Sequence, residues 1–215
     1  RAQIFHTPHD YAAFETVLEQ AVARFNLRLL AYTVMPNHFH LVLWPRQNQG
    51  PAVSRFMKWL QQTHTQRCHA ARKSAGEGRL YQGRFKAFPI QTGFNDFQFL
   101  RKTCRYVERN PLRANLVPAA DLWQPSSLYR RLHGTPRQQQ LLAPWPDGAY
   151  PGNATWLQRL HTPLTPKEQA ALTQSLSRDC PFGSPAWQSA TANSLNPQHA
   201  FRPRGRPQKQ TNKDV

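Results

Sequence analysis

Apolar residues recur at two spacings along the first half of the chain, and the spacing distinguishes helices from strands. Residues 8–25 carry apolar side chains every three or four positions, which is the pattern of an amphipathic helix. Residues 27–35 and 38–44 are nearly continuous apolar runs, and Pro36-Asn37 between them favours a turn. The pattern therefore predicts a helix followed by an antiparallel hairpin.

Two further helices and one further strand follow. Residues 52–72 predict a basic amphipathic helix, residues 84–90 a strand, and residues 94–110 a helix that ends before Pro111. A first strand upstream, missing from this chain, would complete a βαββαβ order. The fold class that we expect is α+β: a ferredoxin-like antiparallel sheet with helices on one face, plus an added helix that bears Tyr106.

Proline divides the chain. Of its 19 prolines, 5 lie in residues 1–110 and 14 in residues 111–215, and the apolar periodicity is dense up to about Tyr129 and then thins. We expect a domain at residues 1–132, a proline-rich extension at 133–200 that packs on it or is linked to it, and a basic disordered tail at 201–215. The tryptophans of the extension favour packing over stacking on bases.

The charge of the chain indicates its partner. The formal net charge is +17, from 28 Lys and Arg against 11 Asp and Glu, which indicates a polyanion and by default nucleic acid. No run approaches the roughly 20 apolar residues of a membrane span, and no signal peptide is visible. We expect a cytoplasmic, nucleoid-associated protein with no membrane partner, acting as a monomer or homodimer.

Two histidines flank a phenylalanine in the second predicted strand. Side chains alternate along a strand, so His38 and His40 share one face while Phe39 points to the other. Two neighbouring neutral imidazoles can bind one metal ion, although two solvated surface histidines would give the same pattern. Val42 stands where a histidine-triad hydrolase needs another histidine, and no cysteine is near enough in sequence to suggest a structural zinc site.

The last predicted helix carries a tyrosine outside its apolar stripe. Lys102, Tyr106 and Asn110 follow one another at four-residue spacing, so we expect them on one polar and basic face. A phenol attacks a phosphodiester only with help from a metal and from nearby cations, here Lys102, Arg105 and Arg109. A partly buried aromatic beside a core helix is the alternative. Asn110 is expected at the helix end with its amide directed outward.

Together these residues resemble the single-tyrosine HUH transposases, and best the branch of REP-associated tyrosine transposases. The likeness spans about residues 1–130. Four segments carry it, in the order found in that branch: RAQIFHTPHDYAAF (1–14), His38-Phe39-His40, QGRFKAFPI (82–90) and YVERNPLRANLV (106–117).

The resemblance implies a metal-dependent endonuclease and strand transferase that acts on single-stranded DNA at palindromic hairpins of bacterial genomes. Tyr106 would be the nucleophile and would form a 5′-phosphotyrosine, leaving a 3′-OH that can rejoin the strands. His38, His40 and Asn110 would bind Mg²⁺ or Mn²⁺. The residues expected to bind DNA are Arg84, Lys102, Arg105, Arg109, Arg113, Arg202, Arg204 and Arg206.

Three questions remain open at the level of sequence. A sheet of this kind also carries nucleic-acid-binding modules that catalyse nothing. A plasmid-type nicking enzyme shares HUH chemistry, but its motifs usually come in another order. The tail segment RPRGRP resembles an AT-hook of the DNA minor groove, while a plain basic tail would supply counterion release alone.

Overall fold

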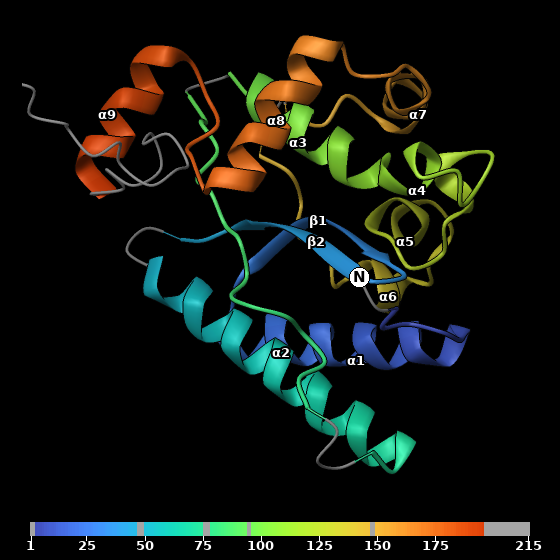
Figure 1. Cartoon of the computed structure of the whole chain (residues 1–215). Helices are drawn as coiled ribbons and strands as arrows, with labels where there is room; N and C mark the ends of the chain where they lie inside the picture. The colour runs from blue at the N-terminus through green and yellow to red at the C-terminus, as the bar shows by residue number, and fades with distance from the viewer. Residues whose placement is uncertain (1–2, 47–49, 75–77, 94–95, 147–148, 196–215) are drawn as a thin grey trace, which may run out of the picture.

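A two-stranded antiparallel hairpin lies between two layers of helices (Figure 1). The computed structural model describes the chain except for residues 1–2, 47–49, 75–77, 94–95, 147–148 and 196–215. Its elements are α1 (Pro8–Phe25), β1 (Arg28–Met35), β2 (His38–Trp44), α2 (Gly50–Arg72), α3 (Gln98–Glu108), α4 (Asn110–Arg113), the 3₁₀ turn η1 (Ala120–Leu122), α5 (Ser127–His133), α6 (Pro136–Gln139), α7 (Asn153–His161), α8 (Pro166–Arg178) and α9 (Pro185–Leu195). The predicted α+β class is confirmed.

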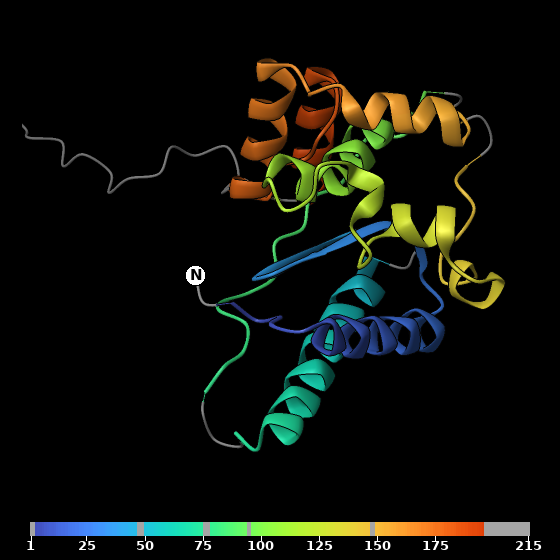
Figure 2. The same cartoon turned by 90° about the vertical axis from the view of Figure 1, so that its right-hand side faces the viewer.

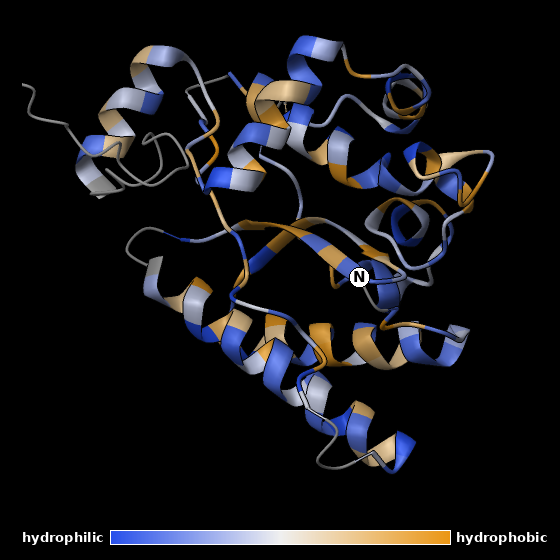
Figure 3. Ribbon diagram, in the orientation of Figure 1, coloured by the Kyte–Doolittle hydropathy of each residue, from blue (hydrophilic) through white to orange (hydrophobic). Residues whose placement is uncertain are grey.

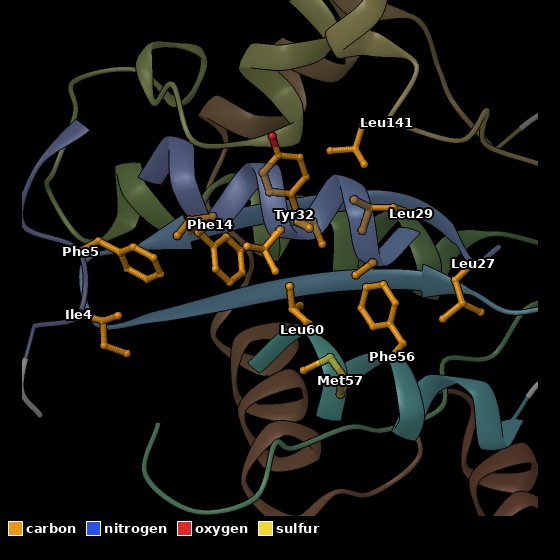
Figure 4. Packing of buried hydrophobic residues seen from close by; sticks show 14 of the residues in the cluster. Ile4, Phe5, Phe14, Leu27, Leu29, Tyr32, Phe56, Met57, Leu60 and Leu141 are labelled. Atoms are coloured by element: carbon orange, nitrogen blue, oxygen red, sulfur yellow. The ribbon is translucent and has the colours of Figure 1, made fainter. Parts of the chain in front are cut away.

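One face of the hairpin packs on α1 and α2. Phe39, Leu41 and Leu43 point to this side, as the alternation predicts, and join a core that includes Phe14 and Leu60. Figure 4 shows this single cluster, with Phe14 and Tyr32 higher in the view and Leu60 and Met57 lower. Figure 3 shows that both strands are mostly hydrophobic, which fits a sheet covered on both faces.

The other face of the hairpin packs on α3 and the extension. Val42 and Trp44 point to this side and join a second core with Leu100, Tyr106 and Trp156. In the view of Figure 2 the strands are seen nearly edge-on, with the blue and teal helices below and the green to red helices above. The side of the sheet that carries the two histidines is therefore covered by helices that come late in the chain.

The two outer edges of the hairpin differ. The edge of β1 is covered, because Tyr32 N donates to Ser127 Oγ and Val34 N to Pro125 O, at 2.9 Å each. The outer edge of β2 borders a cavity of about 1540 Å³, whose opposite wall is the segment 79–90. All seven residues of β2 line this cavity. Because successive side chains point to opposite faces, the cavity runs along the edge of the strand.

Residues 84–90 do not form the predicted third strand. Of this segment only Ile90 makes a β-bridge, parallel to Phe182, and the sheet has two strands among the residues that the structure describes. The cavity separates the segment from β2, so the backbone finds partners in the extension instead: Ala87 N donates to Asp179 Oδ1 and Gln91 N to Phe182 O. The prediction of a third strand at residues 84–90 is therefore wrong.

The helix predicted at residues 94–110 is not stopped by proline. It continues beyond Pro111 as a second, short helix. Helix α3 begins at Gln98, not at residue 94, and α4 continues past Pro111, which occupies the first turn of α4, where its missing N–H is tolerated. Pro111 leaves the carbonyl of Val107 without its helical donor. Thr33 Oγ1 in β1 donates to that carbonyl at 2.9 Å, which ties α3 to the sheet.

The extension packs on this core along several contacts. Ala143 N donates to Leu29 O at 2.8 Å, Trp156 is fully buried, and Phe182 packs edge-on against Phe99. The tail at 201–215 lies outside the described residues, and the two boundaries between the three predicted regions stay predictions. No helix in the described part of the chain combines the length and the apolar character that crossing a membrane requires.

Candidate active site

The two histidines of β2 point toward one another at the cavity. Their Nε2 atoms are 3.1 Å apart and their ring centroids 4.8 Å apart. Asn37 Oδ1 lies 2.5 Å from His38 Nδ1. An amide oxygen is an acceptor, so this contact places a proton on Nδ1 and leaves the lone pair of the neutral ring on Nε2.

The pKa of His40 is lowered to about 3, above all by burial and further by the neighbouring His38 and Arg113. At neutral pH the ring is therefore neutral and available as a ligand. Its partner in β1 is Thr33, opposite it in the hairpin register. The hairpin register thus fixes the position of this imidazole, and burial keeps the ring neutral.

Tyr106 lies directly beside the histidine pair. Its ring centroid is 5.8 Å from that of His40, the two rings meet edge to face, and both side chains line the cavity. The side chain is only 8% exposed, so it is not on an open polar face as expected from the helix pattern. The reason is that α3 is covered on two sides, by the sheet and by the extension.

Arg113 joins the tyrosine to the asparagine. Its guanidinium lies 5.1 Å from the Tyr106 ring, its Nη2 is 3.4 Å from the Tyr106 hydroxyl oxygen, and it donates to Asn110 Oδ1 at 2.7 Å. Asn110 is 1% exposed rather than directed outward. Its Nδ2 is buried and has no hydrogen-bond partner among the described residues, a condition expected where a ligand completes a site.

Three cations that were expected beside the phenol, two in α3 and one directly after it, point elsewhere. Lys102 pairs with Glu168 at 3.3 Å. Arg105 donates to the carbonyls of Thr162 and Pro163, and Arg109 Nε donates to Leu160 O at 2.8 Å. The structure brings His38, His40, Tyr106, Asn110 and Arg113 together, while these three side chains hold the extension.

The remaining predicted DNA contacts are spread out. Arg84 is exposed on the wall of the cavity opposite β2. Arg202, Arg204 and Arg206 lie outside the described residues. The sequence reasoning missed the central place of Arg113. Its spacing was a usable signal, because positions 106, 110 and 113 follow a helix at intervals of four and three and so fall on one side.

The residues present fit a divalent metal ion in part. Two ligands at about 2.1 Å from one ion and at right angles to each other lie about 3 Å apart, which matches the separation of the two Nε2 atoms. Within the described part of the chain, no group of three or more His, Cys, Asp and Glu side chains could hold a metal. Any third protein ligand would be of another kind, and Asn110 is connected to Tyr106, beside the pair, through Arg113.

The amino-acid sequence matches one protein-family model. The family model described as "Transposase IS200 like" matches residues 1–110, which is about half of the chain and includes the hairpin, α3 and Asn110. No curated protein and no solved structure matches the chain. The match covers the histidine pair and the tyrosine that the structure places side by side, and the chain belongs to the IS200-like transposases.

Proposed function

We propose that this chain is a single-strand-specific DNA endonuclease and strand transferase of the REP-associated branch, with Tyr106 as its nucleophile. The observation that carries the proposal is the position of the phenol: it lies against His40, at the wall of a cavity that both side chains line. A tyrosine held there for packing alone would not need a guanidinium at its hydroxyl.

The chain's own residues supply most of the proposed chemistry. The phenol gives up its proton and its oxygen attacks the phosphorus, so that an O–P bond forms as the bond to the 3′ oxygen breaks. The 3′ oxygen takes up a proton, which gives a 5′-phosphotyrosine and a free 3′-OH. Arg113 stabilises the negative charge that develops on the phenol oxygen and on the phosphate. The covalent link conserves the energy of the phosphodiester, so the 3′-OH can reverse the step and join strands without ATP.

The histidine pair is proposed to hold the metal ion. His38 and His40 would bind it through Nε2, with the amide oxygen of Asn110 as third ligand. When bound, a divalent ion polarises the phosphate that is attacked. Two imidazoles and an amide suit Mn²⁺ somewhat better than Mg²⁺, which prefers an all-oxygen shell.

The substrate is proposed to be single-stranded DNA beside a palindromic hairpin. The excess positive charge of the chain, +17, supplies sequence-independent affinity for phosphates. Arg84 and the tail are also proposed to contact the DNA strand. Lys102, Arg105 and Arg109 can contribute only to the general field, because their side chains are engaged with the extension.

A covalent-capture experiment tests the proposal. Wild-type protein and Tyr106→Phe are incubated with Mn²⁺ and an end-labelled library of single-stranded genomic fragments, and the products are separated on a denaturing gel. We expect a protein-linked band in the wild type alone, and sequencing of the captured fragments should show hairpins next to the cut. Binding of equal strength with no linked band would instead establish a non-catalytic binding module.

A further inference from the structure

Glu108 is a fully buried carboxylate two residues after the tyrosine. It is 0% exposed and accepts hydrogen bonds from three side chains. Its Oε1 accepts from Ser127 Oγ and, at 3.0 Å, from Arg131 Nη1, and its Oε2 accepts from Trp156 Nε1 at 2.6 Å. The carboxylate therefore joins α3 to α5 and α7 at one point.

A buried charge of this kind is costly unless every partner is in place. Removing a carboxylate from water costs several kcal/mol, and a well-packed apolar residue often gives equal or greater stability. Here the cost is offset by one cation and two neutral donors, all of them nearly or fully buried. Such an arrangement favours one geometry over others, because any shift of α3 by a fraction of an ångström strains three hydrogen bonds together.

The hydrogen bonds of Glu108 restrict the position of Tyr106, because both residues belong to the same turn of α3. Helical residues advance by about 100° each, so the side chain two positions after Tyr106 points to nearly the opposite side of α3. Tyr106 faces His40 in the sheet, while Glu108 faces α5 and α7. Between them, the carbonyl of Val107 accepts from Thr33 in β1. The helix is thus fixed from both sides at the turn that carries the phenol.

The hydrogen-bond partners of Glu108 all lie outside the part of the chain that the family model matches. Ser127, Arg131 and Trp156 lie beyond residue 110, where the match to the IS200-like transposases ends. The extension is further attached to α3 by Arg101, which donates to Ala149 O at 2.8 Å, and by Arg109, which donates to Leu160 O. We propose that Glu108 is a positioning residue, and that α5 and α7 act through it as a clamp that holds Tyr106 of the same chain at the histidine pair. This inference rests on the proposed role of Tyr106.

Trp156→Phe tests the clamp without removing a buried charge. It takes away the donor to Glu108 Oε2 while keeping an aromatic ring. Trp145→Phe is the matched control, because Trp145 packs against Trp156 at 5.2 Å between ring centroids but donates to Leu30 O and not to Glu108. We expect the single-turnover rate of tyrosine–DNA linkage to fall about tenfold in Trp156→Phe and to stay near wild type in Trp145→Phe, with equal DNA affinity in both.

A second measurement reports on the tyrosine without any reaction. With 3-fluorotyrosine at position 106, the ¹⁹F signal should be single in the wild type and in Trp145→Phe, and broadened or doubled in Trp156→Phe. The clamp is refuted if this signal is unchanged by Trp156→Phe, or if both variants lower the linkage rate in proportion to their loss of melting temperature. If the wild type forms no linkage at all, the proposed function fails, and the ¹⁹F comparison still decides whether Glu108 positions the ring.

Discussion

Tyr106 shows what a single residue's sequence position can and cannot reveal. The four-residue spacing correctly aligns it with Asn110, and strand alternation correctly puts His38 and His40 on one face. The sequence left open whether Tyr106 would lie on a polar face or be partly buried, because exposure depends on what packs against α3 from 40 or more residues away in the sequence. The cation beside the phenol likewise turned out to be Arg113, since the nearer arginines bind carbonyls of the extension.

At this scale, His38→Ala should abolish tyrosine–DNA linkage while leaving affinity for a hairpin oligonucleotide largely intact. The reason is that affinity comes from many cations spread over the chain, whereas the metal would depend on two imidazoles. Linkage is measured on a denaturing gel with Mn²⁺ and affinity by fluorescence anisotropy. His9→Ala, an exposed histidine of α1, is the control. An equal loss of linkage and affinity would argue against a ligand role for His38.

At the scale of elements, the spacing of apolar residues predicts helix α1 and the hairpin. It does not reveal whether residues 84–90 pair as a strand or whether the helix continues through Pro111. Helix α1 matches its predicted bounds because Thr7 and Asp10 form a capping box before an apolar stripe. The segment 84–90 reads as a strand but has no neighbouring strand to pair with in the described structure. Pro111 reads as a stop, yet the chain continues as α4 because proline is tolerated in a first turn.

The packing of α2 against α1 should make stability depend on pH through His64. Burial lowers the pKa of His64 from 6.5 to about 4, with Arg72 lowering it further and Asp10 opposing. Its Nδ1 lies 2.7 Å from the hydroxyl of Tyr81, and its ring stacks on Phe5.

Because the folded pKa lies below the unfolded one, the unfolded chain binds the proton more readily between these values. Stability is therefore full above about pH 6.5 and falls as the pH drops toward 4. At 1.36 kcal/mol for each pH unit between the two pKa values, the loss is about 3 kcal/mol. Urea unfolding at pH 7 and pH 4.5 should show a smaller drop for His64→Phe than for the wild type, since other titrating groups are common to both. An identical drop in the two proteins would exclude His64 as the cause.

At the scale of the whole molecule, the net charge indicates a polyanionic partner. The extension supplies part of the second hydrophobic core. The net charge of +17 comes from composition alone and needs no structure. Composition cannot reveal that several arginines hold the chain together instead of facing DNA. Arg131, for example, binds Glu108 and Leu30 O, and it packs over Tyr150.

Deleting residues 201–215 should weaken binding to single-stranded DNA and flatten its dependence on salt. The segment contains five Lys and Arg side chains, and each phosphate contact on a single strand contributes about 0.7 to the slope of log affinity against log salt. We expect the slope to fall by about 2 to 3, measured by anisotropy between 50 and 300 mM NaCl.

A full-length chain with these five residues changed to Gln is the matched control for tail length, and it should behave like the deletion. An unchanged slope in both proteins would refute a role for the tail in DNA binding.

The sequence by itself determined the first helix and the hairpin, the shared face of the two histidines, the alignment of Tyr106 with Asn110 and the polyanionic partner. These depend on periods of two and 3.6 residues and on charge, which any stretch of chain displays without its neighbours. Tertiary structure alone decided that Tyr106 is buried beside His40, that Arg113 is its cation and that Glu108 fixes its helix. The physical reason is that His40 and Trp156 lie far in sequence from the helix that they contact. Arg113 is close in sequence, but it is the cation at the phenol because the extension engages Arg105 and Arg109.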